Sequence, residues 1–299
     1  MASVADTTLA VSPRRRRGPV LHFIGRLFRE KPLGAAGAVV FVLFLFCGIF
    51  ADVLAPYGMN QISPINRLKP PSLQFPFGTD NLGRDMLSRC LYGAQLSVII
   101  GLSAAALATV VSILIGIVSG YLGGKFDLVL QRFVDAWMSF PDLIILIVVV
   151  SVVGPGMPQI IVTLGLLLGI AGSRIIRGAV VSVRENMYVH AAQSTGASTF
   201  RILWRHILPN VMAPVIVLFT TRVGTVILAE SGLAFLGLGV PPPSPTWGGL
   251  LSGSGRTFML QGPWLALAPG LCLTVVVYAT NMFGDALRDL LDPRMRGSR

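Results

Sequence analysis

Long apolar blocks separated by short polar segments make up most of this chain. Six blocks meet or approach the length of about 20 residues that a helix needs to cross a bilayer. They are residues 33–54, 96–122, 128–153, 160–176, 211–235 and 264–287. Because every backbone N–H and C=O must be paired inside hydrocarbon, each block is predicted to be a helix. The pattern therefore predicts an all-α membrane protein with six transmembrane helices.

The third block is the least regular of the six. Three charged residues interrupt it, namely Arg132, Asp135 and Asp142, and Pro141 is expected to kink its helix. Only residues 143–153 form a long stretch without charge, apolar except for Ser151. We nevertheless count the block as a span, because five spans would remove the asymmetry in basic residues between the two sides of the membrane.

Composition and charge agree with a membrane location. Hydrophobic residues make up 53% of the 299 positions and charged residues 12%, which is about half the charged fraction of a soluble domain. With six spans and an internal N-terminus, most of the 24 basic residues fall on cytoplasmic segments. The exceptions are Arg67, Lys69, Arg84, Arg89 and Arg256 outside, and Arg222 within a span. The positive-inside rule then places both termini in the cytoplasm.

The N-terminal tail, residues 1–32, is polar and carries the run Arg14 to Arg17. The first apolar block exceeds the roughly 7–15 residues of a signal-peptide core and no clear cleavage site follows it, so it is interpreted as a retained signal anchor. The arginine run is explained by topology and attraction to anionic lipid, in preference to nucleic-acid binding. The predicted plan is this tail, a first helix with an extracytoplasmic loop (33–90), a core of five helices (91–291) and a cytoplasmic tail (292–299).

Few residues offer chemistry of their own. The cysteines Cys47, Cys90 and Cys272 show no CxxC or Cys/His spacing, and predict neither a disulfide framework nor a metal site. The three histidines are confined to the tail and one polar loop, which leaves little material for a membrane enzyme. The only Gly-Lys pair, Gly124-Lys125, lacks the upstream glycine of a P-loop, so no nucleotide site is predicted.

The polar loop of residues 184–210 has an unusual pattern. In its second half, apolar residues recur at helical spacing while two arginines fall on another face: Phe200, Leu203, Trp204 and Ile207 against Arg201 and Arg205. This pattern predicts a short amphipathic helix on the cytoplasmic surface.

The first half of the loop predicts a second short helix. Ala191 and Ala192 are small enough for close helix approach, Gly196 permits a sharp turn, and Pro209 suits the first turn of the fifth span. The result is a hairpin of two helices joined at a glycine. Such a hairpin would fit a groove on a partner protein, or it would rest on lipid headgroups.

The string HAAQSTGASTFRILWRHILP, residues 190–209, resembles the EAA loop of bacterial ATP-binding-cassette importer permeases. That loop has the pattern Glu-Ala-Ala, three residues, Gly, and a hydrophobic-Leu-Pro ending. The matching positions are Ala191, Ala192, Gly196, Leu208 and Pro209, and His190 stands where the family has glutamate. Segments 75–97, 230–251 and 281–296 are similar to one subfamily, the C-type permease subunits of oligopeptide and dipeptide importers.

The resemblance implies the type I importer fold and a mechanism. An extracytoplasmic binding protein would deliver peptides to this chain and a B-type permease partner in the bacterial inner membrane. Two cytoplasmic ATPases would hold ATP and Mg²⁺, so this chain itself would need no cofactor. The coupling residues implied are His190, Ala191, Ala192, Gly196, Phe200, Leu203, Trp204 and Pro209. Similar subunits import glutathione, nickel chelates or opines, whereas a passive channel or receptor would not need a hairpin that docks ATPases.

Arg222 is predicted to lie deep inside the fifth span. It follows Pro209 by about 13 residues, or roughly 20 Å of helix. A charge at that depth is expensive and usually faces a cavity or a partner. Arg222 therefore either lines the translocation path, where it would attract a peptide carboxylate, or forms a structural pair with Asp135 or Asp142.

Segment 237–247, on the predicted outer side, is too rich in Gly and Pro for a helix. By resemblance it caps the external mouth through Gly237, Gly239, Pro242 and Trp247; the alternative is a loop that only returns the chain. Its tryptophan is of the membrane-interface type.

Alternating charges in segment 78–89 predict salt bridges at the start of the second span rather than catalysis by paired carboxylates. They are Asp80, Arg84, Asp85 and Arg89. The pairs Gly116 with Gly120 and Gly165 with Gly169 predict close helix packing, with a channel-lining role as the alternative.

Overall fold

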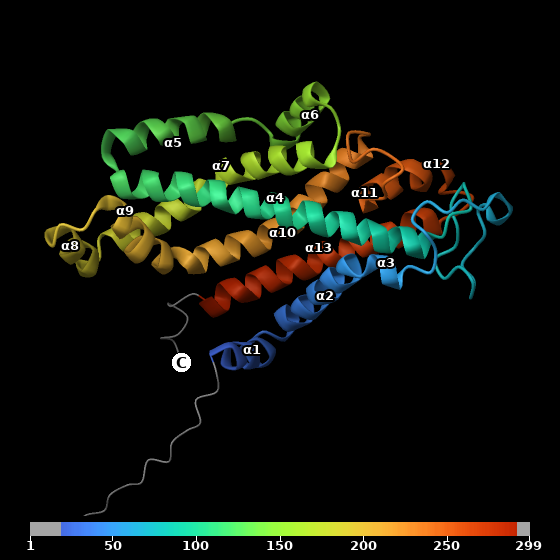
Figure 1. Ribbon diagram of the computed structural model, residues 1–299, viewed down its shortest axis with the longest axis horizontal. Helices are drawn as coiled ribbons and strands as arrows, with labels where there is room; N and C mark the ends of the chain where they lie inside the picture. Colours follow the sequence, from blue (N-terminus) through green and yellow to red (C-terminus); the bar gives the residue numbers. More distant parts are fainter. Residues whose placement is uncertain (1–18, 292–299) are drawn as a thin grey trace, which may run out of the picture.

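The computed structural model describes residues 19–291. In that part of the chain every element of regular secondary structure is a helix (Figure 1). The predicted basic run Arg14 to Arg17 and the tail 292–299 lie outside the described residues. Five of these helices are long and apolar enough to cross a membrane, or up to six if one bent pair is a single span. The prediction of an all-α, multi-span protein is confirmed.

The long helices coincide closely with the apolar blocks that predicted them or extend beyond these blocks. They are α2 (Pro32–Ile49) with the short α3 (Ala51–Leu54), α4 (Met86–Leu122), α7 (Met157–Arg184), α10 (Met212–Phe235) and α13 (Trp264–Leu291). Hydropathy marks only the part of a helix that suits lipid, whereas the backbone hydrogen bonds continue into polar turns. For this reason α4 begins at Met86, well before the apolar block at residue 96.

The third predicted span is two helices rather than one kinked helix. The helices α5 (Gly124–Met138) and α6 (Asp142–Val153) are bent by 83° at the break between them. Pro141 precedes α6 in extended conformation, since its ring cannot continue a helix from α5. Two arginines of α7 hold α5 in place: Arg177 pairs with Asp127, and Arg174 pairs with Asp135.

Glycines let α4 and α7 lie side by side (Figure 1). A Cβ added to Gly116 of α4 would lie 2.7 Å from the carbonyl oxygen of Ser173 in α7. A Cβ added to Gly169 of α7 would lie 2.7 Å from Cβ of Val111 in α4. Small residues at such positions allow the close backbone approach that packs membrane helices. The packing role predicted for the glycine pairs is therefore confirmed.

The remaining spans continue the bundle, and α1 (Pro19–Glu30) adds a helix that the sequence analysis did not predict. α10 packs on α4 and α13, and α13 packs on α2. Leu27 of α1 is buried against Ala286 and Leu290 of α13. Lys31, between α1 and α2, donates to Asp289 at 2.6 Å. These contacts fix the tail helix beside the last turns of α13.

Short elements gather at the two ends of the bundle. We call one of them the hairpin end; it carries α8 (Met187–Ser194) and α9 (Thr199–Ile202) and is on the left of Figure 1. The opposite end, which we call the loop end, holds residues 55–85 and 236–263. Its short elements are η1 (Pro64–Asn66), α11 (Trp247–Leu250), the π turn η4 (Leu251–Gly255) and α12 (Arg256–Phe258).

The predicted salt bridges at the start of the second span are present at the loop end. Asp80 is fully buried and accepts from Nε of Arg84 at 2.6 Å. Asp85 precedes α4, and its carboxylate accepts from the backbone N–H of Ser88 at 2.7 Å. An acceptor in that position satisfies one of the free N–H groups of the helix terminus. These carboxylates therefore fix where α4 begins.

Candidate functional site

The hairpin end carries the helix–glycine–helix hairpin that the sequence predicted, formed by α8 and α9. The second arm does not stop before the fifth span. A π turn, η2 (Leu203–Ile207), and a 3-10 turn, η3 (Leu208–Val211), lead from α9 directly into α10, so one helix runs from Thr199 to Phe235. Pro209 therefore lies inside a continuous helix rather than at its first turn. The irregular winding beside it accommodates a residue that has no N–H to donate.

Gly196 closes α8 with a Schellman motif. Its φ is +76°, which is the left-handed region. The N–H of Ala197 bonds to the carbonyl of Ala192 at 3.1 Å, and the N–H of Gly196 bonds to that of Gln193 at 3.0 Å. These two bonds satisfy carbonyls that the helix end leaves free. Ser198 then caps α9 by accepting from the N–H of Arg201 at 3.4 Å.

This geometry predicts that Gly196→Val weakens the turn, whereas Gly196→Asn is tolerated. A left-handed residue other than Gly costs about 1–2 kcal/mol, and Asn visits the region more easily than a β-branched side chain. Hydrogen exchange at the amide of Ala197 should therefore rise roughly 5- to 30-fold in the valine variant. No side chain lies within 4 Å of the position, so steric clash does not explain such a change. Equal exchange rates of the Ala197 amide in the valine and asparagine variants would contradict the role of Gly196 in the Schellman motif.

The hairpin rests on a buried apolar base. Val189 of α8 and Ile202 of α9 are buried, as is Ile207 of the π turn. They pack in one cluster with Ile176 and Val180 of α7. This base packs both arms of the hairpin against α7, so the hairpin is fixed to the helix bundle by buried contacts as well as by its chain connections.

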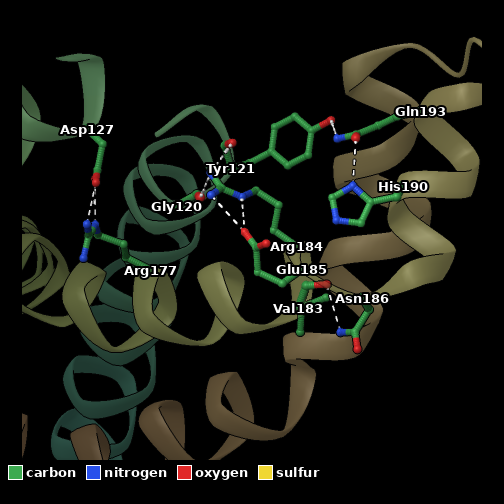
Figure 2. A network of polar contacts seen from close by, with 10 residues as sticks. All are labelled: Gly120, Tyr121, Asp127, Arg177, Val183, Arg184, Glu185, Asn186, His190 and Gln193. Carbon is green, nitrogen blue, oxygen red and sulfur yellow. Dashed lines mark hydrogen bonds and ion pairs between the residues drawn. The ribbon is translucent and has the colours of Figure 1, made fainter. Parts of the chain in front are cut away.

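Polar contacts fix the point where α7 meets the hairpin (Figure 2). Arg184, the last residue of α7, donates to the carbonyls of Gly120 at 3.4 Å and Tyr121 at 3.2 Å. Those carbonyls belong to the last turn of α4, where helical partners are missing. Arg184 also donates to Glu185 at 3.1 Å. The sequence analysis missed this role of Arg184, although a basic residue that ends a helix is a usual signal.

His190, which replaces the family's glutamate, is exposed on α8. Its Nδ1 lies 3.4 Å from Oε1 of Gln193, and Nε2 of Gln193 donates to the hydroxyl of Tyr121 at 3.2 Å (Figure 2). The chain of contacts links α8 to the end of α4. An imidazole N–H can donate to Oε1 of Gln193, whereas an ionised carboxylate has no proton to donate.

The three most exposed large apolar side chains of the hairpin are Met187, Phe200 and Trp204, and we call them together the hairpin patch. These side chains are 88%, 76% and 66% exposed. The rings of Phe200 and Trp204 stack, with centroids 6.4 Å apart and planes 4° apart. Aromatic side chains on a rigid base are typical anchors of protein interfaces.

The structure corrects the predicted apolar stripe on this arm. Phe200 and Trp204 are exposed, whereas Leu203 is partly buried and Ile207 is fully buried. The π turn winds more slowly than an α-helix, so the spacing that would align Ile207 with Trp204 is lost. Of the small residues of α8, Ala191 is exposed and Ala192 packs against the buried base. The hairpin patch therefore contains two of the four residues of the stripe.

Arg222 is buried between three spans. Its guanidinium donates to Oγ of Ser112 in α4 at 3.1 Å and to the carbonyl of Leu168 in α7, and it lies against Gly172. The predicted alternative of a pair with Asp135 or Asp142 is wrong, since Asp135 pairs with Arg132 and Arg174 instead. Within residues 19–291 no carboxylate comes within ion-pair distance of Arg222.

Residues 237–246 are non-helical, as predicted, but Trp247, which begins α11, is not at a membrane interface. Trp247 is 2% exposed, and its Nε1 donates to the carbonyl of Cys90 at 3.0 Å. Its ring lies 5.5 Å from that of Phe44 and against Gly93 of α4. The absence of a side chain at Gly93 makes room for the indole. Trp247 therefore anchors the segment in the core, and Gly237, Gly239 and Pro242 line a cavity above it.

The exposed aromatic pair on a buried base gives the hairpin the form of a binding surface. The described residues contain no group of three or more His, Cys, Asp or Glu side chains placed to hold a metal ion. The hairpin patch is apolar and stands on a buried base at the end of two long helices.

Comparison with protein families identifies the chain. A family model described as "binding-protein-dependent transport system inner membrane component" matches residues 112–297. The chain belongs to this family of permeases.

Other comparisons agree with the family. A model for the N-terminal transmembrane domain of oligopeptide transport permease C matches residues 24–71 of the permease. The dipeptide transport system permease protein DppC of Alkalihalophilus pseudofirmus is 37% identical over 97% of this chain and 93% of its own. A putative peptide transport system permease protein of Brucella suis is 38% identical over 99% of each chain. The glutathione transport system permease protein GsiD of Escherichia coli O157:H7 is 37% identical over 99% of this chain and 97% of its own.

A solved structure shares the fold of the permease. The methionine ABC transporter MetNI in an inward-facing conformation matches with a TM-score of 0.57 at 16% identity, over 69% of this chain and 98% of the matched chain. At this identity the likeness concerns the fold alone. It agrees with the importer transmembrane fold that the sequence predicted.

Proposed function

We propose that this permease forms half of the translocation channel of an ATP-driven importer of di- or oligopeptides. The observation that carries the proposal is the hairpin patch, an exposed aromatic pair on a buried base. The peptide class is supported by the names of relatives that align along almost the whole chain. A second permease subunit of the B type would complete the channel, and an extracytoplasmic binding protein would deliver the peptide.

In this proposal the hairpin patch docks on a cytoplasmic ATPase subunit. ATP and Mg²⁺ are held by two such partner subunits, and this chain contributes no cofactor site. α8 follows α7 after two residues, and α9 continues into α10. A push on the hairpin therefore reaches two spans at once. The buried base and the Arg184 contacts keep the hairpin from bending independently of those spans.

The same proposal assigns the hairpin end to the cytoplasm. Basic residues gather there, among them Lys31, Lys125, Arg184, Arg201 and Arg288. A cytoplasmic excess of Lys and Arg is the usual signal of membrane topology. The loop end then meets the binding protein, with Gly237, Gly239 and Pro242 at the external mouth as a cap.

In the proposed importer, Arg222 is a candidate residue of the translocation path. Its hydrogen-bond partners are neutral oxygens of Ser112 and Leu168, and no acid among residues 19–291 compensates its charge. An uncompensated charge would attract the carboxylate of a passing peptide if the surrounding helices separate during the transport cycle.

The experiment is uptake by the full complex in proteoliposomes, with the binding protein and both ATPases present. ATP-dependent accumulation of dialanine supports the proposal. One relative is a glutathione permease, so glutathione is the second substrate to supply. If the complex accumulated glutathione but not dialanine, glutathione would replace dipeptides as the assigned substrate. Accumulation of either substrate without ATP would contradict the proposal of an ATP-driven importer.

A further inference from the structure

A cavity of about 400 Å³ lies at the loop end between the start of α4 and the segment that follows α10. Asn81, Arg84 and Arg89 line one side of it, and the run of prolines 241–243 lines the other. Both charged side chains in its wall are arginines, and no carboxylate of the described residues takes part in the lining. The volume is within the range of small-ligand sites.

Arg89 lacks a full set of partners although it is only 6% exposed. Its Nη1 donates to the carbonyl of Met59 at 3.4 Å, while its Nε has no hydrogen-bond partner. The carboxylate of Asp80 is 3.8 Å from that Nε, which is too far for a hydrogen bond. A buried cation with unused donors is costly, and an incoming anion would relieve that cost.

Most carboxylate oxygens of the neighbouring acids are engaged, and Oδ1 of Asp85 is the one without a hydrogen-bond partner. Asp80 accepts from Nε of Arg84 at 2.6 Å and from the backbone N–H groups of Leu82 and Arg84. Oδ2 of Asp85 accepts from the N–H and the hydroxyl of Ser88. Arg89 is therefore the more buried of the two arginines in this cluster, and its Nε is left without a hydrogen-bond partner. The N-terminus of α4, a helix of 37 residues, adds positive potential beside it.

We propose that this cavity binds the C-terminal carboxylate of a peptide before the peptide enters the channel. The inference rests on the proposed function, because it takes peptides as the substrate. Arg89 supplies the planar donor fork that suits a carboxylate, and Arg84 adds charge at the rim. A small ligand fits better than a side chain of the binding protein, because Arg89 is nearly enclosed and the volume suits a short peptide.

The test compares dialanine with its C-terminal amide as substrates of the full complex. We expect Arg89→Gln to lower the ratio of kcat/KM for the acid to that for the amide by roughly 10- to 100-fold, as for loss of a charged hydrogen bond. The ratio does not depend on how much complex folds. Arg89→Lys keeps the charge but not the fork, and it should lower the ratio less.

Arg256→Gln is the matched control. Arg256 also lies at the loop end, over the ring of Phe235 at 5.7 Å, and does not line the cavity. It should leave the ratio unchanged. An Arg89→Gln complex that still transports dialanine with the wild-type ratio would overturn the carboxylate site and leave the peptide importer intact. Equal loss of both substrates would overturn it too and point to docking of the binding protein. Failure of the wild-type complex to take up dialanine would instead defeat the proposed function.

Discussion

Replacing Phe200 and Trp204 together with Ala should lower ATP-dependent uptake at least about tenfold and release the ATPase subunits during purification. Buried aromatic anchors of interfaces contribute about 2 kcal/mol or more each, and tenfold corresponds to about 1.4 kcal/mol. Both side chains are exposed in the permease itself, so their loss should leave its own stability almost unchanged. The measurements are uptake, ATPase co-purification and thermal unfolding of the isolated permease.

Leu260→Ala is the control for this double variant. Leu260 is another exposed hydrophobic residue, located at the loop end after α12. The account predicts normal uptake and normal ATPase retention for it. If the double variant retained the ATPases and full transport, the hairpin patch would not be the docking surface.

Trp247→Ala should destabilise the permease far more than the loss of an exposed aromatic side chain does. Removing a buried aromatic ring costs about 3–5 kcal/mol, because the cavity remains. The indole fills the space above Gly93 and packs on Phe44, and Nε1 donates to the carbonyl of Cys90. The midpoint of thermal unfolding in detergent should therefore fall clearly below that of the wild type.

Two other variants separate the causes of that loss. Trp247→Phe keeps a ring against Phe44 but removes the indole N–H that donates to the carbonyl of Cys90, so it should cost about 0.5–1.5 kcal/mol. Trp204→Ala removes a tryptophan that is exposed, and it should change the midpoint little. An unfolding midpoint of Trp247→Ala equal to that of Trp204→Ala would show that Trp247 is not part of the core.

Much of the fold was predictable because the lipid bilayer imposes a simple rule on sequence. Long apolar blocks located the main spans, and the glycine pairs indicated which helices approach closely. The turn at Gly196 was also predictable, since a glycine between two short helices has a definite backbone role. These features depend on residues that are near one another in the chain.

Features that depend on distant residues were not predictable. Pro141 indicated a kink, but the 83° bend also requires that Arg174 and Arg177 of α7 hold α5 in place. The burial of Trp247 depends on Gly93, which is far away in the sequence. α1 was missed because twelve residues with arginines on one face do not form an apolar block.

Only those parts of the candidate site that depend on residues close together in the sequence could be predicted. The hairpin and its glycine follow from local pattern, whereas the division of the apolar stripe follows from a π turn that periodicity does not reveal. Arg184 and Arg89 acquire their roles only when α4 and its neighbours come together. Sequence alone identified Arg184 as a basic residue near the end of a span and placed Arg89 in a segment of predicted salt bridges, but it did not give the partners of either residue.

The central claim is that the hairpin faces the cytoplasm, opposite to the loop end. It is tested most directly by labelling single cysteines with a membrane-impermeant maleimide, after Cys47, Cys90 and Cys272 are replaced by Ser. The highly exposed positions Met187 and Leu73 are the sites for Met187→Cys and Leu73→Cys. The account predicts that spheroplasts label only Leu73→Cys, and that inverted vesicles stripped of ATPases label only Met187→Cys. Labelling of Met187→Cys in intact spheroplasts would contradict it.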